Sequence, residues 1–283
     1  MLPSKQFKTI GIGVTFSPNL KANIYEASRL ALMFRSILIL IHVGDVSEEK
    51  KEKFNKILSP FIHQNLRVQF VFKTGDPVDT ILSVCQDYSI DLLIIGALKK
   101  ENIVNYYLGS IARKITRRSE CSVLLLINPS VKRVPCEHIV VNGLKDPKTE
   151  QTIKSAFYVA HHLGATKMTI VEEINQTKIA LKVEDDKSLR KVNIAKERIK
   201  LRETSRIKKI IEHVPEKHTK NVLIKSQPIF GKQGYSISHY AQIVRADLLV
   251  MNAPSKMTFW DRLFPHDIEH ILAELPTDVL IVQ

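Results

Sequence analysis

Gly96 and the pair Gly109-Ser110 are the residues whose types and spacing best suit this chain to bind an anion. Gly96 follows an apolar run at 92–95, and Gly109-Ser110 opens an amphipathic stretch that leads to a second apolar run at 123–127. Apolar runs bounded by turn residues are typical of strands buried on both faces, so this order predicts a βαβ unit. Ligands of parallel sheets bind beyond the carboxyl ends of the strands, and the free N–H groups of a helix N-terminus attract phosphate.

This stretch resembles the signature of the universal stress protein family, whose nucleotide-binding members carry G-x-x-G, then nine residues, then G-[ST]. Gly96, Gly109 and Ser110 match it at the full spacing, and Lys99 stands where the second glycine is expected. Lys99 either brings a positive charge to a phosphate or is a solvated loop residue, whose Cβ hinders the backbone approach that glycine permits. Ser110 also has two interpretations, an anion contact or an N-cap residue without a ligand.

The resemblance also implies where an adenine nucleotide would lie. Its phosphates would contact Gly109, Ser110 and Ile111, and its base would lie near Val43 and the turn at Thr15. Family members usually carry an aspartate at the position of Thr15, and a threonine cannot offer the two carboxylate oxygens that a ribose prefers. We therefore expect ATP or AMP, with Mg²⁺ accompanying ATP, to bind weakly and only once per chain.

Residues 1–128 have the pattern of one doubly wound α/β domain. Short apolar or β-branched runs alternate with helical stretches, and the apolar residues of the first helix fall three or four apart. The expected strands are 8–14, 37–43, 68–72, 92–95 and 123–127, and the expected helices are 19–34, 48–64, 77–88 and 111–118.

Residues 138–283 repeat this order after a linker at 129–137. Asp146-Pro147 follows Ser17-Pro18 at an offset of 129 residues, and a repeat of this size indicates tandem copies of one domain. The predicted fold is α/β, with two tandem doubly wound parallel-sheet domains. The resemblance implies that both are of the adenine-nucleotide α-hydrolase-like type.

The last strands of the two domains, 123–127 and 279–282, are short, apolar and free of charged residues. Exposed edges of this kind invite pairing, and fusion raises the effective concentration of one domain for the other. The resemblance implies pairing through these strands. We therefore predict an antiparallel intramolecular pseudo-dimer, and a further homodimer is left open.

The second domain lacks the signature. Asn252 replaces the first glycine, Leu144 the turn threonine and Glu172 the adenine-side valine, while Pro265-His266 stands at the start of the last helix. Proline has no N–H to donate, and a carboxylate repels a phosphate-bearing ligand. We predict that this domain binds no nucleotide.

Positive charge is abundant, with a formal net charge of +13 and an isoelectric point of about 9.6. Much of it lies in a charged helical insertion near 183–214, which also carries one apolar stripe. Such a helix can bind a membrane or a partner, but we expect this one to pack on its own domain. Aromatic residues do not interleave with the basic ones, so nucleic acid and membrane are not expected as partners.

No catalytic or metal-binding set can be assembled from the spacing of residues. His266 and His270 lie four apart without an evident third ligand, and Cys85, Cys121 and Cys136 have no metal-ligand spacing. Unpaired cysteines suit a reducing compartment, and the beginning of the chain lacks the layout of a signal peptide, so we expect a cytoplasmic protein.

The resemblance therefore implies a stress-associated binding or regulatory protein. Any catalytic activity is expected to be limited to slow ATP hydrolysis or autophosphorylation. Two alternatives remain. One is a nucleotide-dependent enzyme of the same superfamily, which needs a catalytic site. The other is a protein-interaction module whose working surface is the basic helix.

Overall fold

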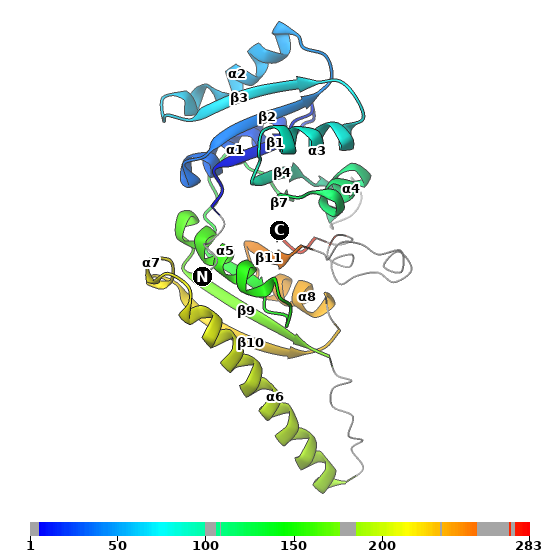
Figure 1. Cartoon of the computed structure of the whole chain (residues 1–283), viewed down its shortest axis with the longest axis vertical. Coiled ribbons are helices and arrows are strands. Elements are labelled where there is room, and N and C mark those ends of the chain that lie inside the picture. The colour runs from blue at the N-terminus through cyan, green and yellow to red at the C-terminus, as the bar shows by residue number, and fades with distance from the viewer. Residues whose placement is uncertain are drawn as a thin grey trace.

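The computed structural model describes residues 6–99, 106–107, 109–175, 185–232, 234–253, 272 and 275–283. Within them, ten strands form one continuous sheet in the order β10-β9-β8-β11-β12-β7-β4-β1-β2-β3 (Figure 1). The neighbouring strands of this sheet are parallel, except that β12 pairs antiparallel with β7. The sheet is thus two parallel halves joined at one antiparallel pair.

The first half follows the order that the sequence predicts. Its main elements are β1 (Thr9–Gly13), α1 (Leu20–Phe34), β2 (Ile37–Val43), α2 (Glu48–Ile62), β3 (Arg67–Lys73), α3 (Pro77–Asp87), β4 (Leu92–Gly96), α4 (Ser110–Arg118) and β7 (Ser122–Leu126). The central strands are buried because they consist of leucine, isoleucine and valine. α3 begins where Asp76 accepts hydrogen bonds from the N–H groups of Val78 and Asp79 at 2.9 and 3.1 Å, with Pro77 in the first helical position.

The second half repeats this arrangement with longer elements. They are β8 (His138–Asn142), α5 (Thr149–Leu163), β9 (Lys167–Ile174), α6 (Asp186–Glu212), α7 (Glu216–Thr219), β10 (Leu223–Phe230), α8 (Tyr235–Ile243), β11 (Leu248–Asn252) and β12 (Asp278–Val282). β10 contains Pro228, which a strand at the edge of a sheet tolerates because one side of its backbone needs no partner.

In each half, a half-buried aspartate connects two neighbouring strands by accepting hydrogen bonds from backbone N–H groups. Asp91 accepts hydrogen bonds from the N–H groups of Lys8 and Thr9 at 2.9 and 3.0 Å, just before β1 pairs with β4. Asp247 accepts from the corresponding N–H groups of residues 137–138, at 2.8 and 2.9 Å. The same contact at the same place in both halves supports their interpretation as two copies of one fold.

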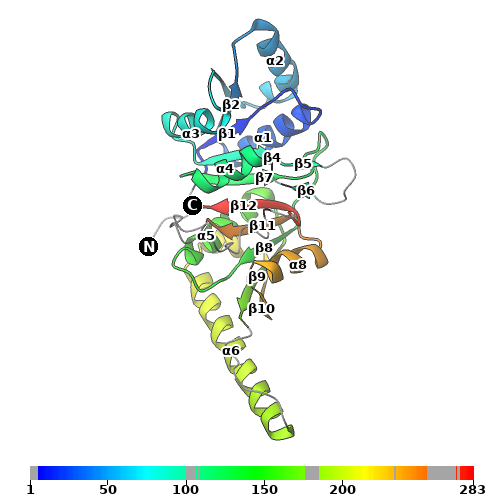
Figure 2. The ribbon, with the colours of Figure 1, turned by 90° about the vertical axis from the view of Figure 1, so that its right-hand side faces the viewer.

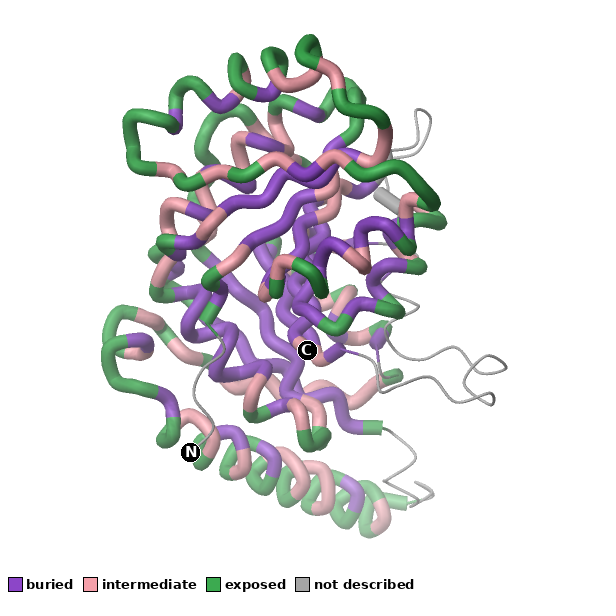
Figure 3. Tube along the Cα trace, turned by 45° about the horizontal axis from the view of Figure 1, so that its top comes forward, coloured by how far each residue is buried: buried purple, intermediate pink, exposed green. Residues whose placement is uncertain are grey.

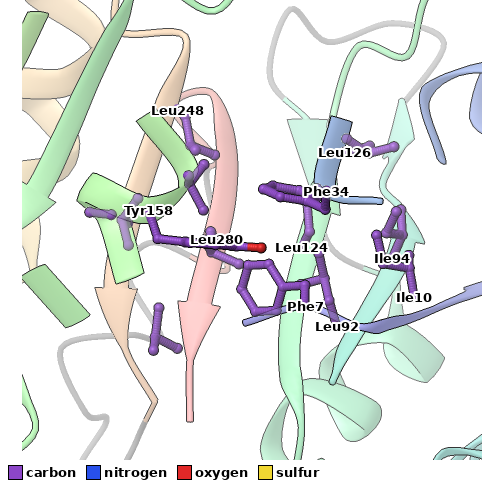
Figure 4. Close-up of a cluster of buried hydrophobic side chains, with 14 of the residues drawn as sticks. Phe7, Ile10, Phe34, Leu92, Ile94, Leu124, Leu126, Tyr158, Leu248 and Leu280 are labelled. Carbon is purple, nitrogen blue, oxygen red and sulfur yellow. The ribbon is translucent and has the colours of Figure 1, made fainter. Parts of the chain in front are cut away.

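The two halves meet where β7 pairs with β12, as Figure 2 shows. In this pair Leu124 is opposite Leu280, and the cluster around them is continuous across the junction (Figure 4). Phe7 belongs to it and contacts the rings of Phe34 and Tyr158, at centroid distances of 5.4 and 5.9 Å. Burying side chains of this size stabilises the junction by about 1.5–3 kcal/mol each. The predicted intramolecular pseudo-dimer is confirmed.

α6 is the segment predicted as a charged insertion, and it follows β9 as α2 follows β2. Ile207 in its C-terminal part is fully buried against the second half, and Val192 nearer its N-terminus is also buried. The N-terminal part projects away from the sheet, and Ile194 and Leu201 are exposed there (Figures 1 and 2). The expectation that this helix packs along its own domain is therefore met over part of its length.

Burial follows the sheet, as Figure 3 shows, with the helices exposing their outer turns. Within the described residues, no helix combines the length and apolar character needed to cross a membrane.

Candidate functional site

The predicted ligand edge of the first half is formed by the carboxyl ends of β1, β2 and β4, which are adjacent in the sheet. Val43 is the last residue of β2, and Gly96 is the last residue of β4. Thr15 lies just beyond β1 and is exposed, and its carbonyl oxygen accepts a hydrogen bond from the N–H of Ser17 at 2.8 Å. The sheet register thus brings these three predicted residues to one edge.

α4 leads from this edge back to the amino end of β7. β4 and β7 are parallel, so the N-terminus of α4 lies on the same side as the carboxyl end of β4. Gly109 occupies the cap position and offers no capping side chain, while Ser110 and Ile111 are exposed. The first N–H groups of α4 are therefore not bonded by a cap, which suits them to an anion. The alternative interpretation of Ser110 as the N-cap residue is wrong, because Ser110 is the first helical residue.

Asn23 of α1 is a site residue that the sequence did not suggest. A Cβ added to Gly96 would lie 2.9 Å from the Asn23 side-chain nitrogen and 3.2 Å from its oxygen. That oxygen, Oδ1, is buried and has no hydrogen-bond partner in the part of the chain that the structure describes. Buried acceptors are normally paired, so this atom is poised for a donor such as a ligand hydroxyl. The sequence feature that could have pointed to Asn23 is its position as a polar amide next to the buried apolar residues of α1.

Phe16 is a second residue that the sequence analysis missed. Its ring is 42% exposed and is stacked on Phe54 of α2 at a centroid distance of 5.4 Å. The ammonium group of Lys53 lies 4.7 Å from the ring centroid, and His42 meets it edge-on at 5.3 Å. His42 in turn bonds through Nδ1 to the carbonyl of Val14 at 3.1 Å, which fixes the loop after β1. An aromatic face beside Thr15 is suited to stacking against a nucleobase.

The remaining predicted residue is Lys99. It pairs with Tyr106 in a two-residue ladder between β5 (Leu98–Lys99) and β6 (Tyr106–Tyr107), a stretch that we expected to be a polar loop. The backbone of Lys99 therefore lies between β4 and α4 in the chain, and its side chain is outside the described residues.

The equivalent edge of the second half is occupied by its own side chains. Asn252, at the position of Gly96, donates from Nδ2 to the Thr149 hydroxyl at 3.1 Å, and that hydroxyl donates to the Leu144 carbonyl at 2.6 Å. These side chains occupy the edge where the first half has only a glycine, although Asn252 Oδ1 has no hydrogen-bond partner among the described residues. The predicted pair Pro265-His266 lies outside the described residues.

Glu172, at the position of Val43, is another side chain that occupies this edge of the second half. Its carboxyl group accepts from the Ser226 hydroxyl at 2.8 Å, and burial raises its pKa to about 7. Arg206 of α6 pairs with Glu203 at 2.9 Å and also donates to the carbonyl of Gly143, so α6 covers the end of β8. The space that a base would need is therefore taken by a polar network from α6 and β10.

The described residues contain no group of three or more metal-ligating side chains arranged to hold a metal ion. His266, His270 and Trp260 lie outside them.

Comparison with known proteins agrees with this geometry. The sequence model of the Universal stress protein family matches residues 48–126. A universal stress protein of Methanocaldococcus jannaschii is 26% identical over 81 residues, which are 29% of this chain and 50% of the relative. The match thus spans about half the length of that curated relative.

Solved structures share the fold over almost the whole chain. A protein of Pseudomonas aeruginosa PAO1, described as functionally unknown, superposes with a TM-score of 0.71 and 16% identity, covering 99% of this chain and 93% of the other. A universal stress protein of Archaeoglobus fulgidus superposes with a TM-score of 0.64 and 13% identity, covering 98% and 99%. The family model thus identifies a universal stress protein domain in residues 48–126, and the solved structures show the same fold over almost the whole chain.

Proposed function

We propose that this chain is a stress-associated regulatory or binding protein that binds one adenine nucleotide weakly, in its first domain. The observation that carries the proposal is the N-terminus of α4, which has no capping side chain and begins at the edge where Gly96, Val43 and Thr15 lie. Phosphates are placed against Gly109, Ser110 and Ile111, as the family signature implies.

The base and ribose would then lie over the ends of β1 and β2. Phe16 supplies an exposed ring and Asn23 supplies an unpaired buried oxygen, and both lie beside the signature residues. Thr15 replaces the carboxylate that other family members direct to the ribose. One lost charge-assisted hydrogen bond costs about 1.5–3 kcal/mol, or roughly ten- to a hundredfold in affinity, so we expect micromolar binding or weaker.

We propose binding rather than rapid catalysis, with ATP hydrolysis or autophosphorylation slow at most. ATP would bring its own Mg²⁺. The second domain serves as a partner that pairs with the first, and its filled edge supports a single nucleotide per chain. We also propose a cytoplasmic location, and a further homodimer is possible in addition to the pairing within the chain.

Calorimetric titration with ATP and AMP tests the assignment. Gly109→Pro removes one N–H from the start of α4 and should weaken binding, whereas Thr15→Asp restores the family carboxylate and should strengthen it about ten- to a hundredfold. Asn252→Ala alters the equivalent position of the second domain and serves as the matched control, with unchanged affinity expected. Equal affinities for wild type, Gly109→Pro and Thr15→Asp, or two sites per chain, would refute the proposal.

A further inference from the structure

A cavity of about 510 Å³ lies between the two domains, and none of the predicted nucleotide-binding residues lines it. It borders the amino ends of β4, β11 and β12 and is walled by α1, α5 and the linker. Its floor is apolar and includes Leu124, Leu248 and Leu280, which Figure 4 shows within the cluster that joins the domains. The volume is in the range of sites that bind small organic molecules, roughly 300–1,000 Å³.

The pseudo-twofold symmetry of the junction is broken at four side chains. On one side Phe7 and Tyr158 pack together, with ring centroids 5.9 Å apart. The repeat offset of 129 residues makes Cys136 the equivalent of Phe7 and Arg29 the equivalent of Tyr158. Both line the cavity. Phe7 lines it as well, so the cavity borders a phenyl ring from one side of the junction and a thiol and a guanidinium from the other.

The linker is held across this opening by specific contacts. Arg29 donates to the carbonyl oxygens of Ser130 and Val131, the second at 2.8 Å. Glu26 pairs with Arg29 at 2.8 Å and accepts from the N–H of Ser130 at 3.2 Å. The wall is therefore built by the folded chain, and the charge of Arg29 is already engaged.

The wall on the side of the second domain is acidic and poorly hydrated. Burial, with a smaller contribution from the neighbouring Glu26 and Asp247, raises the pKa of the Asp278 carboxyl group to about 7. Burial also raises the pKa of the Cys136 thiol to about 12, and Asp247 and Asp278 add to that rise. Asp278 and Cys136 thus lie in a region of low dielectric close to other carboxylates, and Arg133, which also lines the cavity, brings a positive charge to it.

We propose that this cavity binds an amphipathic organic cation, with its aliphatic chain on the leucine floor and its ammonium group donating to the Asp278 carboxylate. An ammonium group relieves the repulsion between Asp278, Asp247 and Glu26, whereas a carboxylate of the same chain length increases it. The aliphatic chain meets only apolar side chains on the floor. The inference does not depend on nucleotide binding, because none of the predicted nucleotide-binding residues lines the cavity.

Titration of the full chain with n-octylamine, octanoate and octanol, each below its micelle concentration, tests the proposal by calorimetry. Wild type should bind one octylamine per chain and should bind octanoate at least about tenfold more weakly. Cys136→Phe places a ring where the symmetry-related residue is Phe7, so it should abolish octylamine binding. Val131→Phe adds the same ring to the exposed part of the linker, outside the cavity lining, and should leave binding unchanged.

Octylamine binding that is equal in wild type and Cys136→Phe, or no binding to wild type, overturns the proposal. Melting curves establish that each variant folds. If Cys136→Phe does not fold, Asp278→Asn decides the question. It removes the negative charge and keeps an oxygen acceptor, so octylamine affinity should fall about tenfold while octanol affinity is unchanged. If Asp278→Asn binds both octylamine and octanol as wild type does, or loses affinity for both equally, Asp278 is not the acceptor of the ammonium group.

Discussion

Asp278 accepts a hydrogen bond from the N–H of Ile127 at 2.8 Å, across the antiparallel strands that join the two domains. The pseudo-twofold axis repeats this contact with another side chain, since the Ser122 hydroxyl accepts from the N–H of Gln283 at 3.3 Å. Ser122 and Ile127 lie 156 residues before Asp278 and Gln283. The junction therefore carries an ionisable group on one side only.

Replacing this carboxyl group should change how stability depends on pH. Burial raises the pKa of Asp278 from 3.8 to about 7, so the folded state holds a proton that the unfolded state has lost between these values. Stability from this group is thus present below pH 3.8 and is lost as pH rises through 7. Asp278→Asn should be at least as stable as wild type at pH 8 and lose less stability between pH 5 and 8.

Chemical denaturation at several pH values measures this difference. Glu172, whose pKa is also raised to about 7, titrates in both proteins and cancels in the comparison. A wild-type protein that gains stability relative to Asp278→Asn as pH rises would show that the carboxylate is favoured at the junction.

The close approach of Gly96 and Asn23 predicts a steric coupling. A Cβ at Gly96 would meet the Asn23 amide at 2.9 Å, so Gly96→Ala should destabilise the protein by about 1–3 kcal/mol. Gly13→Ala is the matched control, because its Cβ would meet only Ile81 at 3.5 Å. The double variant Gly96→Ala with Asn23→Ala should be more stable than the sum of the single changes predicts, as measured in a double-mutant cycle. Strict additivity would contradict the coupling.

His218 should make the packing of α7 on α5 sensitive to acid. Burial, with smaller contributions from the charges of His161, Lys217 and His162, lowers its pKa from 6.5 to about 4. The unfolded state therefore binds a proton before the folded state does, so stability is lost as pH falls from 6.5 towards 4. His218→Phe keeps a ring against Tyr158 and should lose less stability over this interval.

Thermal melts between pH 4.5 and 7.5 check this prediction. His63→Phe changes an exposed histidine and should keep the wild-type dependence on pH. Identical curves for wild type and His218→Phe would exclude His218 as the cause of acid sensitivity.

α6 should bind anionic surfaces only weakly. It carries ten lysine and arginine residues against four acidic ones, but Ile194 and Leu201 are its strongly exposed apolar side chains and do not extend into a continuous stripe. Sedimentation with anionic vesicles should show binding at low salt that disappears at about 150 mM. Charge reversal at Arg198 and Arg202 should abolish the low-salt binding. Tight binding at physiological salt would instead identify α6 as the working surface.

The sequence by itself determined the elements and the family. The strands follow from runs of leucine, isoleucine and valine, α3 begins where Asp76 precedes Pro77, and Gly96 with Gly109 and Ser110 indicates the edge at which a ligand would lie. These features depend on residues close together in the chain, so local patterns suffice to predict them. The repeat and the unguarded last strands, together with the family resemblance, predicted the antiparallel junction.

Only the tertiary structure decided which side chains meet across these elements. Asn23 reaches Gly96 from a helix more than seventy residues earlier, and Phe7 and Cys136 line one cavity although they lie 129 residues apart in the chain. Packing of this kind depends on the volumes of residues far apart in the chain. The periodicity of apolar residues along the chain does not encode this packing, because it does not show which distant side chains will meet or how large they are.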